Sequence, residues 1–293
     1  MDYIKLGASL YLPANRRDIN EIVLKGKYPF LTSVILDTED SVSIENLEQC
    51  YINLENVLVE MPDIKSKDRL LVFIRPRNPE EFKRITLLKN ISKIDGFVLP
   101  KFSALNMNDY LDTLPANIWY MPVLENNIFT EQEILTIRDF ILQHKENLLS
   151  VRIGITDILN ILKTRRNTNY TIYEIPVASN IISRIIFAFA PFQINVTGPV
   201  YEHFGVDSVS ILRQEVEKDL QNGIFGKSAI HPAQVKVINE MYKVSEMEYE
   251  MASKILQENS PAVFNLHNTM QECLTHAEWA KKIIARKEIY GLI

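Results

Sequence analysis

Cysteine is scarce in this sequence, since only Cys50 and Cys273 occur among its 293 residues. Two thiols so far apart are too few for a disulfide scaffold, and unpaired thiols suit a reducing compartment. We therefore expect a cytoplasmic protein. Its stability has to come from an apolar core, for which 46% hydrophobic residues are ample.

Long apolar runs are missing as well. Residues 2–5 carry an early acid and are not followed by the uninterrupted apolar stretch of about 7 to 15 residues that a signal peptide contains, so we expect no export. The most apolar window, residues 181–192, is interrupted by Arg184 and Pro191, and it is shorter than the roughly 20 residues that cross a bilayer. We interpret this window as a buried helix and expect no membrane partner.

Excess positive charge is absent, because 32 Lys and Arg residues face 37 Asp and Glu residues for a net charge of -5. Without a dense basic run, the chain lacks the electrostatic footprint that a phosphate backbone requires, so we expect no nucleic-acid partner. The sequence also contains no G-x-G-x-x-G, P-loop or G-x-S-x-G motif. Dinucleotide, nucleoside triphosphate and serine-hydrolase functions therefore have no motif support.

Eight short apolar runs are present, and polar clusters and stretches with helical periodicity follow them along the chain. This alternation indicates β-α units and a parallel sheet. Runs such as residues 33–36 are apolar at consecutive positions, which is typical of strands buried on both faces. The predicted strands are residues 8–12, 33–36, 70–74, 96–99, 118–124, 151–155, 193–197 and 228–230. We predict an α/β fold, a closed (β/α)8 TIM barrel.

The remaining length is assigned to outer helices and to a tail. Residues 209–220 place four aliphatic side chains on one face and Glu215 outside it, which predicts an amphipathic outer helix. We predict a catalytic barrel over residues 1–231 and a C-terminal helical extension over residues 232–293. The extension should dock on the barrel or on a neighbouring subunit, because its apolar face would otherwise lie in water.

Ionisable side chains follow six of the eight predicted strands. In an α/β barrel the active site lies at the C-terminal ends of the strands, so these groups should meet at one mouth. They are the cluster at residues 37–40, which includes Asp40, followed by Arg75, Lys101, Glu125, Asp157 and His231. Loops are wet and often charged, yet six such positions together favour a site.

Glu125 and Asp157 come from adjacent predicted strands, so the two carboxylates could share one hard divalent cation. Two carboxylates with substrate oxygens and waters are a usual environment for Mg²⁺. The structural alternatives are an N-terminal cap or a surface salt bridge for Glu125, and for Asp157 a cap on a helix that starts at Ile158.

Three further residues have both a functional and a structural interpretation. Arg75 presents a planar fork suited to a substrate carboxylate, or it pairs with an acid of residues 37–40. Lys101 is a cation near the substrate, a Schiff-base lysine or a structural ion-pair partner. His231 contacts substrate, acts as a general acid or base, or holds the end of the barrel in place.

Together these segments resemble the HpcH/HpaI aldolase and citrate lyase β-subunit superfamily. The matching segments are residues 9–13, 34–42, 72–75, 96–101, 124–125, 154–157 and 226–234. They occur in the family's order and span most of the chain. The closer resemblance is to the branch of TIM-barrel C–C bond lyases that is discussed with tellurium-resistance gene clusters, through residues 6–13, 152–154, 157–160 and 270–272, His276, and residues 279–280 and 290–291.

The resemblance implies a Mg²⁺-dependent carbon–carbon lyase that acts on a small oxo-acid or hydroxyacyl substrate by aldol or Claisen chemistry. It implies that Glu125 and Asp157 bind Mg²⁺ and that Arg75 grips the substrate. The proton acceptor stays open among a water molecule, an acid of residues 37–40 and Glu272 supplied by a neighbouring subunit. A homo-oligomer, a trimer or hexamer, is implied as well.

Two departures from the citrate-lyase pattern concern the cofactor. Ala8 stands where those members usually carry Arg, and Ala14 stands where they usually carry Gly. These differences leave the use of a coenzyme A thioester open. Two other functions also stay open, a metal-free Schiff-base aldolase using Lys101 and a barrel that only binds a ligand.

Overall fold

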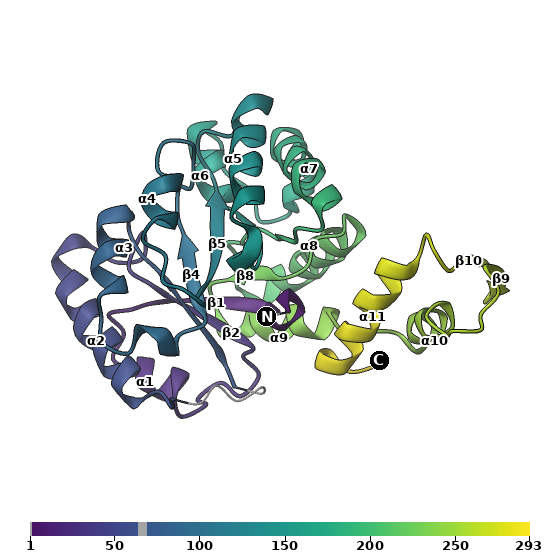
Figure 1. Cartoon of the computed structure of the whole chain (residues 1–293), viewed down its shortest axis with the longest axis horizontal. Coiled ribbons are helices and arrows are strands. Elements are labelled where there is room, and N and C mark those ends of the chain that lie inside the picture. Colours follow the sequence, from purple (N-terminus) through teal and green to yellow (C-terminus); the bar gives the residue numbers. More distant parts are fainter. Residues whose placement is uncertain (1, 64–68) are drawn as a thin grey trace.

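The computed structural model describes residues 2–63 and 69–293. Eight parallel strands form its centre (Figure 1). Their order in the sheet is β7-β6-β5-β4-β3-β2-β1-β8. The strands are β1 Ala8–Pro13, β2 Ser33–Asp37, β3 Leu71–Arg75, β4 Gly96–Leu99, β5 Trp119–Leu124, β6 Val151–Ile153, β7 Val196–Thr197 and β8 Lys227–Ala229. All eight predicted strands are therefore present.

Two strands, β6 and β7, are shorter than predicted by two residues or more, and each has a local cause. β6 ends at Ile153 because Ile155 already begins the helix α6, Ile155–Ile161. β7 begins at Val196 because Gln193 adopts a left-handed backbone with φ 60° at the end of a 3-10 turn. An apolar run does not reveal such a turn, so the sequence overestimated both strands.

The barrel closes between β7 and β8 at Gly198. This residue forms a parallel bridge with Lys227, and its amide donates to the carbonyl of Gly226 at 2.8 Å. The amide of Ser228 donates in turn to the carbonyl of Gly198 at 3.2 Å. The predicted barrel is confirmed, and the bridge at Gly198 joins its two end strands, β7 and β8.

Side chains on each strand alternate between two cores, as the twofold period of a strand requires. Inside the barrel, Ile35, Phe73, Val98 and Met121 pack into one buried cluster. Their chain neighbours point outward and join a larger cluster beneath the helices. The same alternation aims the last residues of β2 and β3 inward, which places their polar side chains at the mouth.

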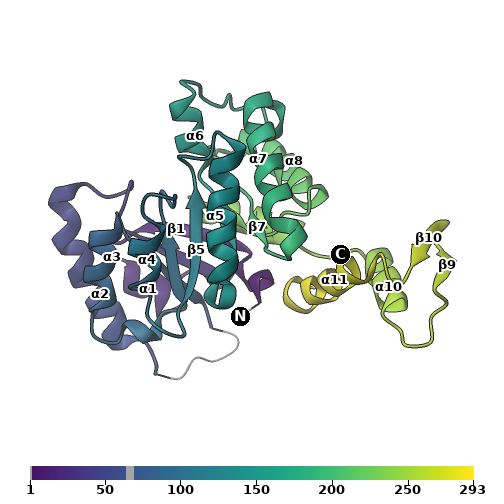
Figure 2. The same cartoon turned by 45° about the horizontal axis from the view of Figure 1, so that its top comes forward.

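The helices of the barrel cover the outer face of the sheet (Figures 1 and 2). They are α1 Ile19–Val23, α2 Leu47–Glu60, α3 Pro79–Thr86, α4 Met107–Leu111, α5 Glu131–Gln143, α6, α7 Pro176–Phe189, α8 Val209–Gln221 and α9 Pro232–Met241. α8 confirms the predicted outer helix, although Glu215 is fully buried rather than exposed. The window at residues 181–192 forms the C-terminal part of α7 and a 3-10 turn, and the helix is buried on one face only, since Phe187 is 76% exposed. Within residues 2–63 and 69–293, no helix is long and apolar enough to cross a membrane.

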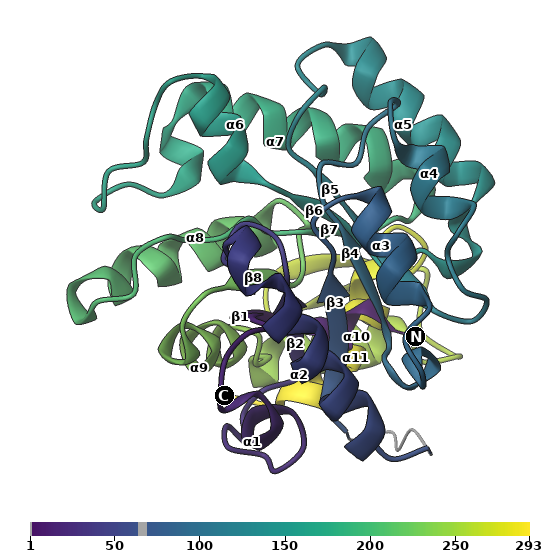
Figure 3. The same cartoon turned by 90° about the vertical axis from the view of Figure 1, so that its left-hand side faces the viewer.

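The extension projects from one side of the barrel and lies behind it in the view of Figure 3. It contains α10 Glu246–Ile255, the antiparallel pair β9 Val263–Leu266 and β10 Thr269–Glu272, and α11 Ala277–Tyr290. The hairpin was not predicted, because its two turn residues are His267 and Asn268, with φ of 54° and 58°, instead of the usual Asn-Gly.

The extension is attached at the start of the barrel. α11 packs on the 3-10 helix Tyr3–Leu6, and the hydroxyl of Tyr290 donates to the carbonyl of Ile4 at 2.7 Å. α9, which follows His231, packs on β1 and α8 as an outer helix of the barrel. The division at residue 231 stays a prediction, and this packing favours counting α9 with the barrel.

Candidate active site

A cavity of about 320 Å³ opens at the C-terminal ends of the strands. Residues from seven strands or the loops after them line it, because the inward position recurs at every second residue of a strand. The lining residues are Tyr11, Asp37, Asp40, Ser41, Arg75, Val123, Glu125, Arg152, Ile153, Gly154, Thr156, Asp157, Val200, Ser228 and Ile230. The cavity therefore contains four of the predicted site residues, Asp40, Arg75, Glu125 and Asp157.

Glu125 is held deep in this cavity. Glu125 is only 2% exposed, and its Oε1 accepts a hydrogen bond from the backbone N–H of Lys101 at 2.6 Å. Gly154 lies directly against it, since a Cβ at position 154 would sit 2.1 Å from Oε2. Glu125 is therefore neither a cap nor a surface salt bridge.

Asp157 faces the same cavity from the first turn of α6. α6 begins at Ile155, so Asp157 lies inside the helix and does not cap it. Burial first, and then the charges of Glu39 and Asp157, raise the pKa of Glu125 to about 8. Two carboxylates that repel each other across one cavity are a donor set that a divalent cation would neutralise.

The donors fit Mg²⁺, which usually takes one or two carboxylates and completes its shell with waters and substrate oxygens. Glu125 and Asp157 supply two such carboxylates to one cavity. Among the described residues, no group of three or more His, Cys, Asp or Glu side chains is arranged as a metal site. The pair is therefore the candidate site, and its role as ligand stays a prediction.

Arg75 is held by two acidic residues of the preceding strand and loop, Asp37 and Glu39. Its Nε and Nη2 donate to the two carboxylate oxygens of Asp37 at 2.6 and 2.8 Å, and its Nη1 lies 2.9 Å from Oε2 of Glu39. Asp37 and Arg75 are register partners on β2 and β3, which explains the pairing. The structure shows the ion pair that the sequence left open, and the grip on substrate stays a prediction.

Lys101 lies at the rim with Asp40. Its ammonium contacts the carboxylate of Glu39 and lies 3.5 Å from that of Asp40, whose side chain is 55% exposed. Burial alone would lower the pKa of Lys101, but the hydrogen bond to Glu39 and the charges of Glu39, Asp40 and Glu125 raise it. A Schiff-base lysine needs a lowered pKa, so this environment opposes that role.

His231 has a structural task at the end of β8. Its Nδ1 accepts from the backbone N–H of Ala233 at 3.2 Å, which caps α9. Its ring stacks on Phe204 with centroids 5.0 Å apart. The side chain is exposed and does not line the cavity, so its predicted contact with substrate gains no geometric support.

Glu272 is the last residue of β10, in the part of the extension that projects from the barrel (Figure 1). Its carboxylate accepts from the hydroxyl of Thr275 at 2.7 Å. Within one chain it does not line the mouth. Glu272 would reach a site only on a neighbouring subunit, and that arrangement stays a prediction.

Arg152 belongs to the matching segment at residues 152–154, but the sequence predicted no role for it in the site. It lies on β6, is 1% exposed, and reaches the cavity from the inward position of the strand. A charged residue between Val151 and Ile153 in a buried strand was the available signal. Such a charge needs either a partner or a function.

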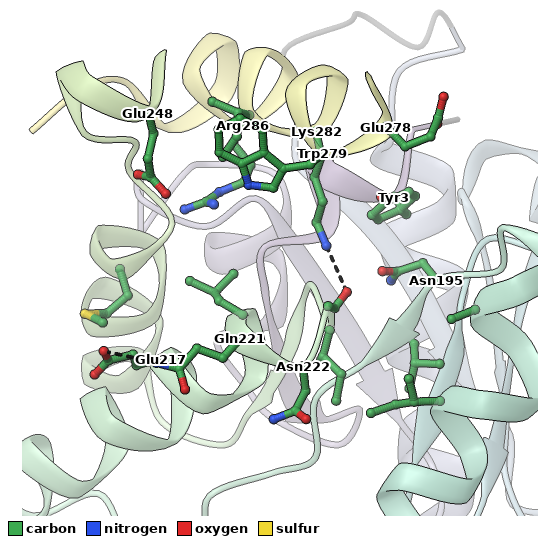
Figure 4. A pocket seen from close by; sticks show the side chains of 18 of the residues that line it. Tyr3, Asn195, Glu217, Gln221, Asn222, Glu248, Glu278, Trp279, Lys282 and Arg286 are labelled. Carbon is green, nitrogen blue, oxygen red and sulfur yellow. Dashed lines mark hydrogen bonds between the residues drawn. The ribbon is translucent and has the colours of Figure 1, made fainter. Parts of the chain in front are cut away.

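A larger cavity of about 960 Å³ lies between α11 and the barrel (Figure 4). Lys282 projects into it, and its ammonium donates to the carbonyl of Gly223 at 2.9 Å. Burial and the charge of Arg286 lower the pKa of Lys282 to about 8. This cavity contains neither Glu125 nor Asp157, so the smaller one is the candidate active site.

The barrel and its carboxylate-lined mouth define a protein of the TIM-barrel class with a candidate site for catalysis, and comparison with known proteins identifies the family. The family model described as C–C bond lyase of the TIM-barrel fold matches residues 1–292, so the chain belongs to that family. No curated protein sequence matches the chain. The link to tellurium-resistance gene clusters stays a prediction.

Solved structures similar to this chain include proteins named CitE and citrate lyase, and this likeness shows the barrel fold. CitE from Mycobacterium tuberculosis, in complex with magnesium, acetoacetate and coenzyme A, is 18% identical with a TM-score of 0.66, over 96% of this chain and 98% of that one. A citrate lyase from Burkholderia xenovorans LB400 is 15% identical with a TM-score of 0.71, over 98% and 93%. RipC from Yersinia pestis is 21% identical with a TM-score of 0.61, over 84% and 99%.

Proposed function

We propose that this protein is a Mg²⁺-dependent carbon–carbon lyase that cleaves or forms a bond in a small oxo-acid or hydroxyacyl substrate by aldol or Claisen chemistry. The observation that carries the proposal is the pair Glu125 and Asp157, which face one cavity at the mouth of the barrel. The family supports it, and so does the CitE structure from Mycobacterium tuberculosis, which contains magnesium and acetoacetate.

Glu125 and Asp157 would hold the ion, which supplies electrostatic stabilisation of the negative charge that develops on substrate oxygens as the bond breaks. The N–H of Lys101 fixes Oε1 of Glu125, so this ligand is oriented before substrate arrives. Asp37 and Glu39 lock the guanidinium of Arg75 in one position beside Tyr11. The contact of Arg75 with a substrate carboxylate stays part of the proposal, although Asp37 and Glu39 already balance its charge.

Asp40 is the proposed proton acceptor within the chain, because it lines the cavity and is the most exposed acid of the cluster at residues 37–40. Its carboxylate lies 3.9 Å from Nη1 of Arg75 and 3.5 Å from Nζ of Lys101. Despite these two contacts the side chain of Asp40 stays 55% exposed. Lys101 lies close enough to add positive charge at the rim. Glu272 of a neighbouring subunit and the contact of His231 with substrate stay part of the proposal.

The test is to measure Mg²⁺ affinity by calorimetry in Glu125→Gln and Asp157→Asn. Each change removes one anionic ligand while keeping the side-chain shape, so we expect affinity to fall about tenfold or more. Asp139→Asn, an exposed acid on α5, is the matched control and should bind as the unchanged protein does. Unchanged affinity in both site variants would refute the metal assignment.

Activity separates the remaining alternatives. We expect turnover of a panel of oxo-acids and hydroxyacyl thioesters to stop in EDTA and to return with Mg²⁺. An enzyme that forms a Schiff base through Lys101 would instead survive EDTA and be trapped by borohydride with substrate. Faster turnover of a coenzyme A thioester than of its free acid would establish thioester use, and Mg²⁺ binding without any turnover would favour a ligand-binding barrel.

A further inference from the structure

Two guanidinium groups flank the ring of Tyr11 inside the mouth. The guanidinium carbon of Arg75 lies 5.0 Å from the ring centroid, and that of Arg152 lies 5.6 Å from it. The charge of Arg75 is already balanced, because Asp37 and Glu39 together contact its Nε and both terminal nitrogens. Arg152 has no such arrangement.

No acid of the described residues pairs with Arg152. Its Nη2 donates to the hydroxyl of Ser228 at 2.9 Å, its Nη1 lies 3.6 Å from the sulfur of Met121, and its Nε has no partner. Burying a cation without a counter-charge is strongly unfavourable. Arg152 therefore carries a buried positive charge that no acidic side chain of the described residues balances.

The position of Arg152 relative to the carboxylate pair is set by strand register. Arg152 pairs with Val123, two residues before Glu125, so its guanidinium starts one level deeper in the barrel. Both residues line the same cavity of about 320 Å³. A small molecule that contacts Glu125 and Asp157 at one end can therefore direct its other end toward Arg152 and Ser228.

We propose that Arg152, supported by Ser228, binds a carboxylate of the substrate at the end remote from Glu125 and Asp157. The substrate is then an oxo- or hydroxy-acid with a second anionic group, and Arg152 determines this specificity. A planar guanidinium matches a carboxylate in shape and charge, which makes it the suitable group. The inference rests on the proposed function, because it takes Glu125 and Asp157 as the other pole of the site.

Two probes test it, oxaloacetate and pyruvate, which share an oxo-acid group and differ in one carboxylate. In the presence of Mg²⁺, we expect the unchanged protein to bind oxaloacetate more tightly by roughly 10- to 100-fold, the range of hydrogen bonds to a charged partner. Arg152→Met should reduce oxaloacetate affinity to the level of pyruvate and leave pyruvate affinity and Mg²⁺ affinity unchanged. Calorimetry gives all three constants.

Arg286→Met is the matched control, because Arg286 is another buried guanidinium that lines the larger cavity and donates to the backbone carbonyls of Tyr242 and Lys243. It should keep the discrimination between the probes. If Arg152→Met does not fold, Ser228→Ala replaces it, and the loss of one support should weaken oxaloacetate binding severalfold without affecting pyruvate.

The outcomes are distinguishable. Discrimination that survives in Arg152→Met, or an equal loss of both probes in Ser228→Ala, overturns the subsite and leaves the proposed function intact. An unchanged protein that binds both probes equally overturns the subsite too. Failure of the unchanged protein to bind either probe, together with Mg²⁺ affinity unaffected by Glu125→Gln, overturns the proposed function and the subsite with it.

Discussion

At the scale of single residues, the close approach of Gly154 and Glu125 determines the geometry of the mouth. Gly154 has φ -89°, which other residues adopt without strain, so glycine is needed there for space and not for backbone freedom. An added Cβ would lie 2.1 Å from Oε2 and 2.5 Å from Cβ of Glu125. Position 154 therefore controls where the carboxylate points.

We expect Gly154→Ala to displace Glu125 and to weaken Mg²⁺ binding about as much as Glu125→Gln does. The overpacking should cost about 1–3 kcal/mol of the free energy of unfolding, measured by urea denaturation. Gly205→Ala is the control, because φ is -72° there and nothing lies within 4 Å of the added atom. Normal Mg²⁺ affinity in Gly154→Ala would contradict the proposed role of this contact.

The sequence predicted which residues lie at the mouth, but it did not predict which of their side chains form ion pairs with one another. Position after a strand identified Asp40, Arg75, Glu125 and Asp157 as residues of one cavity, because parallel strands end at the same edge. Sequence did not show that Arg75 is occupied by Asp37 while Arg152 is left unpaired. That distinction depends on contacts between strands far apart in the chain.

At the scale of elements, α8 and β8 are joined by a buried group of charges. Lys227 is fully buried, and its ammonium lies 3.0 Å from Glu215 and 2.8 Å from Asp219. Arg166 contacts Glu215 from the loop after α6, and the hydroxyl of Tyr173 donates to Asp219 at 2.6 Å. These contacts hold α8 against the strand that closes the barrel.

Lys227→Met should destabilise the protein by about 3–5 kcal/mol, because it leaves two carboxylates buried with less positive charge. Urea denaturation measures the change. Lys218→Met, which removes the ammonium of a more exposed pair 3.7 Å from Glu174, should cost less than about 1 kcal/mol. Similar losses in the two variants would mean that the buried group contributes no more than a surface pair.

Elements were easier to predict than their faces. The apolar spacing of residues 209–220 was sufficient to locate α8, since helical periodicity is a local property. The same spacing placed Glu215 off the apolar face, yet Glu215 is fully buried, because Lys227 and Arg166, distant in sequence, compensate its burial. Local patterns do not contain that information.

At the scale of the whole molecule, the extension exposes apolar side chains on and beside its hairpin. Val263, Met270 and Leu274 are exposed, Leu274 at 90%. Apolar residues gathered near Glu272 favour a surface that another subunit covers, which supports the predicted homo-oligomer. A monomer at working concentrations, by light scattering after gel filtration, would contradict this expectation.

Mixing two variants tests whether Glu272 acts between subunits. We expect Glu125→Gln and Glu272→Gln each to have strongly reduced activity alone. Subunits exchanged between them should recover activity, because some sites then combine an intact mouth with an intact Glu272 from the neighbour. Full activity of Glu272→Gln alone, or no recovery on mixing, would show that Glu272 does not act between subunits, and Asp40→Asn then tests the acceptor proposed within the chain.

The attachment of α11 has a consequence for the order in which the molecule forms during synthesis. β1 pairs with both β2 and β8, and Ile4 accepts its hydrogen bond from Tyr290. Residues that leave the ribosome early therefore wait for partners more than two hundred positions later. Contacts of such long range slow folding, so the first strand stays incompletely covered for most of translation. The early part of this chain is where a chaperone has the longest opportunity to bind.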